Sequence, residues 1–309
     1  MRLDSSAAGL FPIAVTPFTP DGKVCSASVD SMTDFYLSCG ATGLTILGIM
    51  GEAPKLDLQD SLAITKQVCA RAAKIPVIVG VSSPGFAAMA SLARGAMERG
   101  AAGVMIAPPS NLRTDDQIVN YYAQAIEAIG DDIPVVVQDY PLTLTVVMTP
   151  KVLRTIFQNH ASCVMLKHED WPGLEKISAM RGFTADGSMK PISILTGNGG
   201  LFLDFEMERG ADGAMTGYAF PDMLADVVRL SKAGEREAAH DLFDAHLPLI
   251  RYEQQQGAGL AVRKYVLMKR GAIRSDAQRK PASSITAKAK AEVDYLLARL
   301  ARKDRRAAV

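Results

Sequence analysis

The stretch Cys163-Val-Met-Leu-Lys167-His-Glu169 combines a buried-strand pattern with a lysine near its end. Four small or apolar residues in a row indicate a strand covered on both faces, as in parallel sheets. A lysine in an apolar pocket loses hydration, which lowers its pKa from about 10.4 and increases the fraction of neutral amine. A neutral amine attacks carbonyl carbons, so Lys167 is a candidate Schiff-base nucleophile. The alternative is a strand-end lysine that reaches solvent, since most lysines are exposed.

Short apolar segments alternate with longer amphipathic segments on both sides of this stretch. The predicted strands lie near residues 11–18, 43–48, 76–81, 103–108, 134–140, 163–167, 192–197 and 213–218. The predicted helices lie near residues 26–39, 57–74, 84–99, 115–128, 149–158, 172–181, 200–209 and 222–233. Strand–helix units at a spacing of about 30 residues favour a closed barrel over an open doubly wound sheet. The sequence therefore predicts an α/β fold, a (β/α)8 TIM barrel, over residues 1–233.

A weak internal repeat supports this organisation. It occurs as Gly40-Ala-Thr-Gly43, Gly100-Ala-Ala-Gly103 and Gly210-Ala-Asp-Gly213. The first glycine of each repeat is predicted to end a helix in a left-handed cap, and the second to precede a strand.

Beyond residue 233 the strand pattern stops, and three helices are predicted near residues 235–255, 257–270 and 286–303. These form a C-terminal three-helix appendage over residues 234–309. The apolar spacing around Leu242, Leu247 and Ile250 is typical of a helix that packs against another surface. We expect that surface to be the barrel or a sister subunit, rather than the appendage forming a separate binding module.

Composition and charge exclude several classes of protein. The 309 residues include 34 basic and 33 acidic side chains, for a net charge of +1, which does not favour nucleic-acid binding. We interpret the basic tail 299–306 as a solvated helix end. The four cysteines lack a C-x-x-C pair, which argues against a zinc site or disulfide framework and favours a cytoplasmic location. No apolar run approaches the length of a membrane span.

Candidate reactive groups follow from the carboxyl ends of the strands, where active sites of such barrels lie. Side chains alternate along a strand, so Gln138 and Tyr140 share one face, as do Lys167 and Glu169. Tyr140 is a candidate proton shuttle, or it packs at the strand end. Glu169 is a candidate acid and base, or it pairs with Lys167 and keeps the lysine charged, which would oppose the chemistry.

Two glycine-rich turns are candidates for binding a carboxylate. Gly48-Ile-Met50-Gly51-Glu52 follows the second strand, and Gly197-Asn198-Gly199-Gly200 follows the seventh. Backbone N–H groups of such turns can point at an anion. The alternative is that both are only tight turns. Glu52 is either a base or a charge that orders its loop, and we favour the ordering role.

The chain resembles the superfamily of dihydrodipicolinate synthase and N-acetylneuraminate lyase, which are class I Schiff-base pyruvate lyases. The matching segments are Val15-Thr-Pro-Phe18, Gly48-x-x-Gly51-Glu52, Pro76-Val-Ile-Val-Gly80, Leu166-Lys167 and Gly210-Ala-Asp-Gly213-Ala-Met-Thr-Gly217. The resemblance implies a barrel with three C-terminal helices, an imine on Lys167, and a homodimer or homotetramer. Because the protonated imine is the electron sink, no metal or organic cofactor is expected.

The sequence departs from the synthases of this superfamily at residues that select the reaction. Ile49 and Met50 replace two threonines, Gln138 replaces the catalytic tyrosine, and Thr143 replaces the arginine for the second substrate's carboxylate. Val137-Gln-Asp-Tyr-Pro141 and the segment beginning at Met215 resemble instead the branch of 2-keto-3-deoxy sugar-acid dehydratases. The resemblance to the superfamily implies Lys167 as the imine-forming residue, and Tyr140 and Glu169 are the candidates for moving protons beside it. The predicted substrate-binding residues are Met50, Gly51, Gln138, Gly197, Asn198 and Met215.

Three functional hypotheses follow. The first is a Schiff-base lyase, a dehydratase or aldolase, acting on a small 2-oxo acid that is a 2-keto-3-deoxy sugar acid. The second is 4-hydroxy-tetrahydrodipicolinate synthase activity, which condenses pyruvate with aspartate semialdehyde. The third is a non-catalytic barrel that binds 2-oxo acids.

Overall fold

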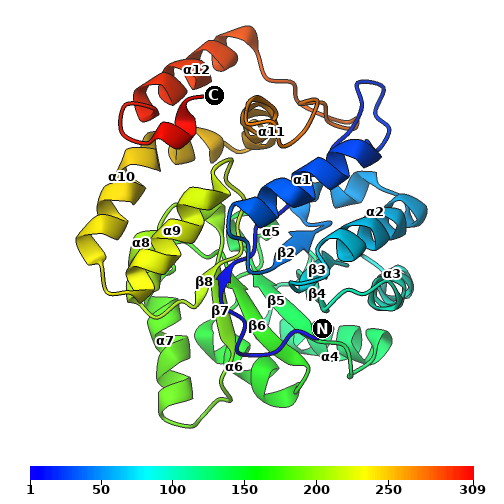
Figure 1. The fold of residues 1–309 in the computed structure, drawn as a ribbon. Coiled ribbons are helices and arrows are strands. Elements are labelled where there is room, and N and C mark those ends of the chain that lie inside the picture. The colour runs from blue at the N-terminus through cyan, green and yellow to red at the C-terminus, as the bar shows by residue number, and fades with distance from the viewer.

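A computed structural model describes residues 1–309 as an eight-stranded parallel barrel surrounded by helices (Figure 1). The strands are β1 (Gly9–Leu10), β2 (Leu44–Ile46), β3 (Val77–Gly80), β4 (Gly103–Ile106), β5 (Val135–Asp139), β6 (Cys163–His168), β7 (Ser193–Thr196) and β8 (Gly213–Ala214). Consecutive strands from β2 to β8 pair with one another, and β1 pairs with β8. The predicted TIM barrel is confirmed.

Helices follow the strands as the amphipathic segments predict. The helices around the barrel are α1 (Ser26–Ser38), α2 (Leu58–Arg71), α3 (Phe86–Glu98), α4 (Asp115–Ile129), α5 (Pro141–Leu144), α6 (Pro150–Asn159), α7 (Leu174–Ala185), α8 (Leu203–Glu208) and α9 (Pro221–Lys232). Short 3-10 turns occur at η1 (Ile49–Gly51), η2 (Ala53–Lys55), η3 (Asn198–Gly200) and η4 (Arg305–Ala307).

The first strand differs from the prediction, which placed it over residues 11–18. The strand itself is Gly9–Leu10, and beyond it the N–H groups of Phe11 and Ile13 still donate to the Ala214 and Thr216 carbonyls at 2.8 and 2.9 Å. Pro12 between them has no N–H to donate. The barrel nevertheless closes through Thr45 of β2. The backbone N–H of Ala14 donates to the Thr45 carbonyl at 2.8 Å, and the Thr45 N–H donates to the Pro12 carbonyl at 3.0 Å.

The glycine repeat has the predicted geometry. Gly40, Gly100 and Gly210 follow α1, α3 and α8 with φ of +84°, +93° and +94°, a region that favours glycine. At the second position, a Cβ on Gly213 would lie 1.9 Å from the Gly9 carbonyl oxygen of the neighbouring strand. This glycine therefore permits the close approach of β8 and β1.

The core has two parts, inside the barrel and between the barrel and its helices. Ten buried residues form the smaller cluster, including Phe11, Met105, Met165, Leu195 and Met215. The larger cluster of 68 residues lies mainly between strands and helices. Side chains of both clusters alternate along β5 and β6, so each strand is buried on both faces.

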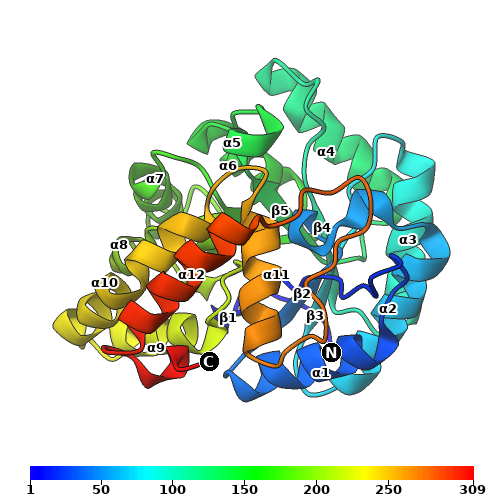
Figure 2. The ribbon, with the colours of Figure 1, turned by 90° about the horizontal axis from the view of Figure 1, so that it is seen from above.

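The appendage consists of α10 (Arg236–Glu253), α11 (Gly259–Lys269) and α12 (Ala287–Leu300), drawn from yellow to red and gathered at one end of the molecule in Figure 1. Figure 2 shows the three helices beside one another. Tyr218 after β8 hydrogen-bonds His246 Nδ1 at 2.9 Å, and His246 Nε2 lies 2.9 Å from Asp304 Oδ2. These contacts fix the tail to the barrel. None of the helices is long and apolar enough to span a membrane.

Candidate active site

Lys167 and Glu169 project from the carboxyl end of β6 toward the inside of the barrel. Their side chains are almost fully buried, and Lys167 Nζ lies 2.7 Å from Glu169 Oε1. Gln138, the register partner of Lys167 on β5, donates from Nε2 to the same Oε1 at 2.7 Å. Lys167 is therefore not a strand-end lysine in solvent. The contact with Glu169 that we gave as the alternative to an acid–base role is present.

The other oxygen of Glu169 faces the turn after β7. Asn198 has φ of 49°, and this left-handed conformation directs its backbone N–H to Glu169 Oε2 at 3.3 Å. Its side-chain amide donates to the Glu169 backbone carbonyl at 2.8 Å. A Cβ on Gly197 would lie 2.3 Å from Glu169 Cγ, so glycine leaves the space that the carboxylate occupies.

A small cavity of about 60 Å³ lies over this cluster. Thirteen residues line it, namely Ile13, Ile49, Met50, Gln138, Tyr140, Lys167, Glu169, Asn198, Gly199, Thr216, Gly217, Gln254 and Arg263. The cavity brings together six of the nine predicted site residues. Gly51 and Gly197 adjoin it without lining it, and Met215 is buried in the interior cluster of the barrel. No contact of Met215 with the cavity supports its predicted binding role.

Tyr140 follows β5 and lines the cavity half-buried. Burial raises the pKa of its phenol, and the nearby Glu169 carboxylate raises it further. The phenol therefore stays protonated at neutral pH and can donate a proton. Thr143, at the position where synthases of the superfamily carry an arginine, is exposed and does not line the cavity.

Glu52 has the contacts of a structural residue. Its buried carboxylate accepts from Lys264 Nζ at 2.5 Å, Lys55 Nζ at 2.8 Å and the Arg279 backbone N–H at 3.1 Å. It does not line the cavity. The carboxylate joins the loop after β2 to the appendage, in agreement with the ordering role favoured above.

The appendage contributes two cavity residues that the sequence did not predict. Gln254 follows α10 and lies against Gly199, while Arg263 of α11 lies against Gly217. A signal was present in the sequence, because Arg263 and Lys264 interrupt an otherwise apolar helix whose residues are buried on all sides. Charged residues in a buried helix need partners: Lys264 pairs with Glu52 at the barrel mouth, and Arg263 pairs with Glu253 of α10.

A larger cavity of about 790 Å³ adjoins the first and shares Ile49 and Gln138 with it. Its walls come from the ends of β2, β3 and β4 and from α2 and α3. Most are apolar, and the polar lining includes Ser61, Ser82, Ser83 and Ser110. Asp57, its only ionisable residue, caps α2 by accepting from the Asp60 N–H at 2.7 Å. The chamber therefore has room for a substrate tail but presents no cation to it.

A second polar cluster lies on the outer face of the same strands. Asp139 Oδ2 accepts from Lys176 of α7 at 2.7 Å, and Lys176 also pairs with Asp170 at 2.5 Å. His168 is fully buried beside them, 3.9 Å from Asp139. Burial raises the pKa of Asp139 to about 7 and, with Lys176, lowers the pKa of His168 to about 4. The outward orientation of His168 and Asp139 agrees with the predicted alternation.

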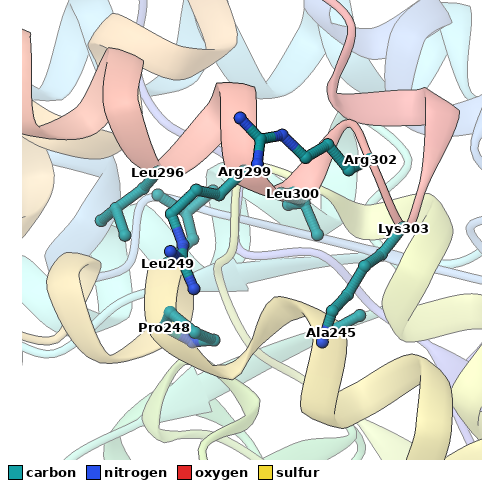
Figure 3. Close-up of a pocket in the computed structure, with 8 residues that line it drawn as sticks. All are labelled: Ala245, Pro248, Leu249, Leu296, Arg299, Leu300, Arg302 and Lys303. Carbon is teal, nitrogen blue, oxygen red and sulfur yellow. The ribbon is translucent and has the colours of Figure 1, made fainter.

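A separate groove lies between α10 and α12, away from these residues (Figure 3). Leucine, proline and alanine side chains form its apolar part, and Arg299, Arg302 and Lys303 supply its charges. None of its residues lines the lysine cavity. The groove contains part of the basic tail that we interpreted as a solvated helix end.

Comparison with known proteins agrees with this architecture. The chain belongs to the dihydrodipicolinate synthetase family, whose model matches residues 6–300. Members of that family are Schiff-base lyases, and this chain is one of them. L-2-keto-3-deoxyarabonate dehydratase of Azospirillum brasilense is 29% identical over 297 residues, covering 94% of each chain. 4-hydroxy-tetrahydrodipicolinate synthase of Rhizobium meliloti is 26% identical and covers 93% of this chain and 96% of its own.

Solved structures show the same fold. A crystal structure described as dihydrodipicolinate synthase from Rhodopseudomonas palustris is 67% identical, with a TM-score of 0.96, and covers 97% of this chain and 99% of its own. YagE of E. coli, solved in complex with pyruvate, has a TM-score of 0.85 at 22% identity, and covers 95% of this chain and 98% of its own. The latter similarity concerns the fold alone.

Proposed function

We propose that the protein dehydrates a 2-keto-3-deoxy sugar acid through an imine on Lys167. The observation that carries the proposal is the buried Lys167–Glu169 pair at 2.7 Å on a cavity at the carboxyl end of the barrel. The pair can exist as ammonium and carboxylate, or as amine and carboxylic acid after transfer of one proton. The second form supplies both the nucleophile and the acid that imine formation needs.

The reaction begins with formation of the imine. The Lys167 amine adds to C2 of the substrate, and the former carbonyl oxygen leaves as water. The protonated imine accepts electrons when Glu169 removes a proton from C3, which forms an enamine. The enamine expels the C4 hydroxyl, which Tyr140 protonates so that it leaves as a second water. Addition of water to the imine releases the dehydrated product and restores the lysine.

The adjoining chamber favours a substrate with an uncharged tail. Serine hydroxyls and backbone groups can bind the hydroxyls of a sugar acid, whereas a second carboxylate would find no cation there. Aspartate semialdehyde carries such a carboxylate. The similarity to L-2-keto-3-deoxyarabonate dehydratase supports the same substrate class.

Synthase activity remains the second candidate, because the 67% identical structure carries the synthase name. A side-by-side measurement of kcat/KM on one preparation separates the two. We expect the best 2-keto-3-deoxy sugar acid to exceed pyruvate plus aspartate semialdehyde by roughly a hundredfold, since the site lacks a charge-assisted partner for the second carboxylate. A higher value for the semialdehyde reaction would assign the protein to the synthases.

We further propose a cytoplasmic homodimer or homotetramer that acts on a small molecule. The four cysteines are all free, as a reducing compartment favours. Exposed apolar side chains such as Trp171 and Phe205 offer surface for a sister subunit. Sedimentation of a single 33.0 kDa species at micromolar concentration would contradict the assembly.

A further inference from the structure

Arg263 of α11 is a buried guanidinium with unused hydrogen-bond donors at the lysine cavity. The residue is 1% exposed, and its only hydrogen bond runs from Nε to Glu253 Oε1 at the long distance of 3.4 Å. Glu253 is its one ion-pair partner, whereas a guanidinium has five N–H donors, and buried donors that stay unpaired are costly. The terminal nitrogens make no hydrogen bond within the protein, although the side chain lines the cavity.

Arg270, at the end of the same helix, shows what a satisfied arginine looks like here. Its nitrogens donate to Asp222 at 2.8 and 3.1 Å and to the Ala219 carbonyl at 2.7 Å. Its guanidinium also stacks on Phe220 at 4.3 Å from the ring centroid. These contacts hold Arg270 as a structural residue. Arg263 lacks an equivalent set, and the difference concerns the two nitrogens at its end.

Gly217 keeps these nitrogens at the cavity wall. A Cβ at this position would lie 2.3 Å from Arg263 Nη1, so any larger residue would displace the guanidinium. Arg263 and Lys167 are the only cations that line the cavity. Once Lys167 has become an imine, its positive charge lies at C2 of the substrate. The carboxylate attached to C2 still needs hydrogen-bond donors, and a guanidinium at the cavity wall can supply two of them.

We propose that Arg263 binds the C1 carboxylate of the 2-oxo acid. This inference rests on the proposed function, since it assumes that the substrate reacts with Lys167. A planar guanidinium can bind both oxygens of a carboxylate through two parallel N–H donors. Arg263 thereby compensates for the hydroxyl contacts that Ile49 and Met50 cannot supply. The appendage, which the sequence suggested only packs, is then part of the substrate site.

The test compares trapping of two ketones on Lys167 by borohydride. Pyruvate carries the carboxylate, and methyl pyruvate carries a neutral ester at the same place. In Arg263→Gln we expect the half-saturating concentration of pyruvate to rise about tenfold or more, because a charge-assisted bidentate contact is lost. The value for methyl pyruvate should change less than twofold. Arg251→Gln removes an exposed charge from the neighbouring α10 and should leave both values unchanged.

The other possible outcomes separate the role of Arg263 from the Schiff-base chemistry. Equal changes for the two ketones, or no change for either, would overturn the role of Arg263 while leaving the Schiff base intact. Failure of the wild-type protein to trap either ketone would instead overturn the proposed function, and this inference with it. If Arg263→Gln does not fold, Arg263→Lys keeps the charge without the fork. A loss confined to pyruvate is expected there too, and unchanged pyruvate affinity would contradict the proposal.

Discussion

The inner and outer faces of β5 and β6 carry two buried lysine–carboxylate pairs of equal length. Lys167 and Glu169 on the inner face are 2.7 Å apart, and so are Lys176 and Asp139 on the outer face. Both lysine side chains are less than a tenth exposed. Distance and burial therefore do not distinguish a reactive lysine from a structural one.

The surroundings of the two pairs do distinguish them. Lys176 has a second carboxylate, Asp170, so two anions hold it between α7 and the strands. Lys167 has a single carboxylate, and that carboxylate is held by amide donors from Gln138 and Asn198. The inner pair lines the lysine cavity, whereas Lys176 and Asp139 line neither this cavity nor the larger chamber beside it. A lysine that must exchange its proton and meet a substrate needs this incomplete, accessible partnership.

Replacing Lys167 of the inner pair should abolish catalysis. Lys167→Ala should reduce turnover of 2-keto-3-deoxy sugar acids by at least about a thousandfold, since removal of a nucleophile eliminates most of the rate enhancement. Assays at high protein concentration would measure the residual activity. Residual activity within tenfold of the wild type would show that another group attacks the substrate.

Replacing Lys176 of the outer pair should reduce stability and leave the reactivity of Lys167 unchanged. Lys176→Met leaves the fully buried Asp139 beside the partly buried Asp170 without their shared cation, which should cost about 3–5 kcal/mol of unfolding free energy. Urea unfolding measures this loss. The folded Lys176→Met protein should still be modified at Lys167 by pyruvate and borohydride. A variant as stable as the wild type that cannot be trapped would assign the outer lysine to the chemistry.

Glu206 of α8 is a buried carboxyl group that does not line the lysine cavity, and we expect it to affect stability. Burial raises its pKa to about 8, far above 4.5, and its Oε2 has no hydrogen-bond partner. Because the folded state holds this proton more tightly, the stabilisation is complete below pH 4.5 and is lost as pH rises toward 8. Glu206→Gln should therefore gain stability over the wild type across that range, on the order of a few kcal/mol. Urea unfolding at several pH values measures this difference. The prediction is wrong if the unfolding free energies of the variant and the wild type change with pH in parallel.

Replacing Tyr140 should lower kcat less than replacing Lys167 does. Tyr140→Phe keeps the ring and removes the proton donor, so kcat should fall roughly ten- to a hundredfold. KM should change little, because binding does not depend on that proton. The matched variant Tyr121→Phe removes a buried hydroxyl from α4, outside the cavity, and should preserve kcat. An unchanged kcat in Tyr140→Phe would transfer the proton step to another group.

The sequence was sufficient for the barrel and for the inner face of β5 and β6. Strand alternation places Gln138 with Tyr140 and Lys167 with Glu169, and these four residues line one cavity. The rule works because both strands are buried on both faces and cannot slip by one residue without exchanging those faces. The first strand was predicted over residues 11–18, after the observed Gly9–Leu10, in a stretch that contains Pro12 and Pro17.

The contribution of the appendage could not be read from local pattern. Arg263 lies 96 positions after Lys167, and no periodicity relates a helix near the C-terminus to the end of β6. Its position depends on how α10 and α11 pack over the barrel, which the sequence specifies only through tertiary contacts. The buried charges in α11 indicate that partners exist but not where they lie.

The most direct test of the account is the site of covalent modification. The protein is incubated with pyruvate or a 2-keto-3-deoxy sugar acid, reduced with borohydride and mapped by peptide mass spectrometry. We expect one adduct, on Lys167, and none on Lys176, which is also buried. An adduct on Lys176 or another lysine, or no adduct with any 2-oxo acid tested, would contradict it.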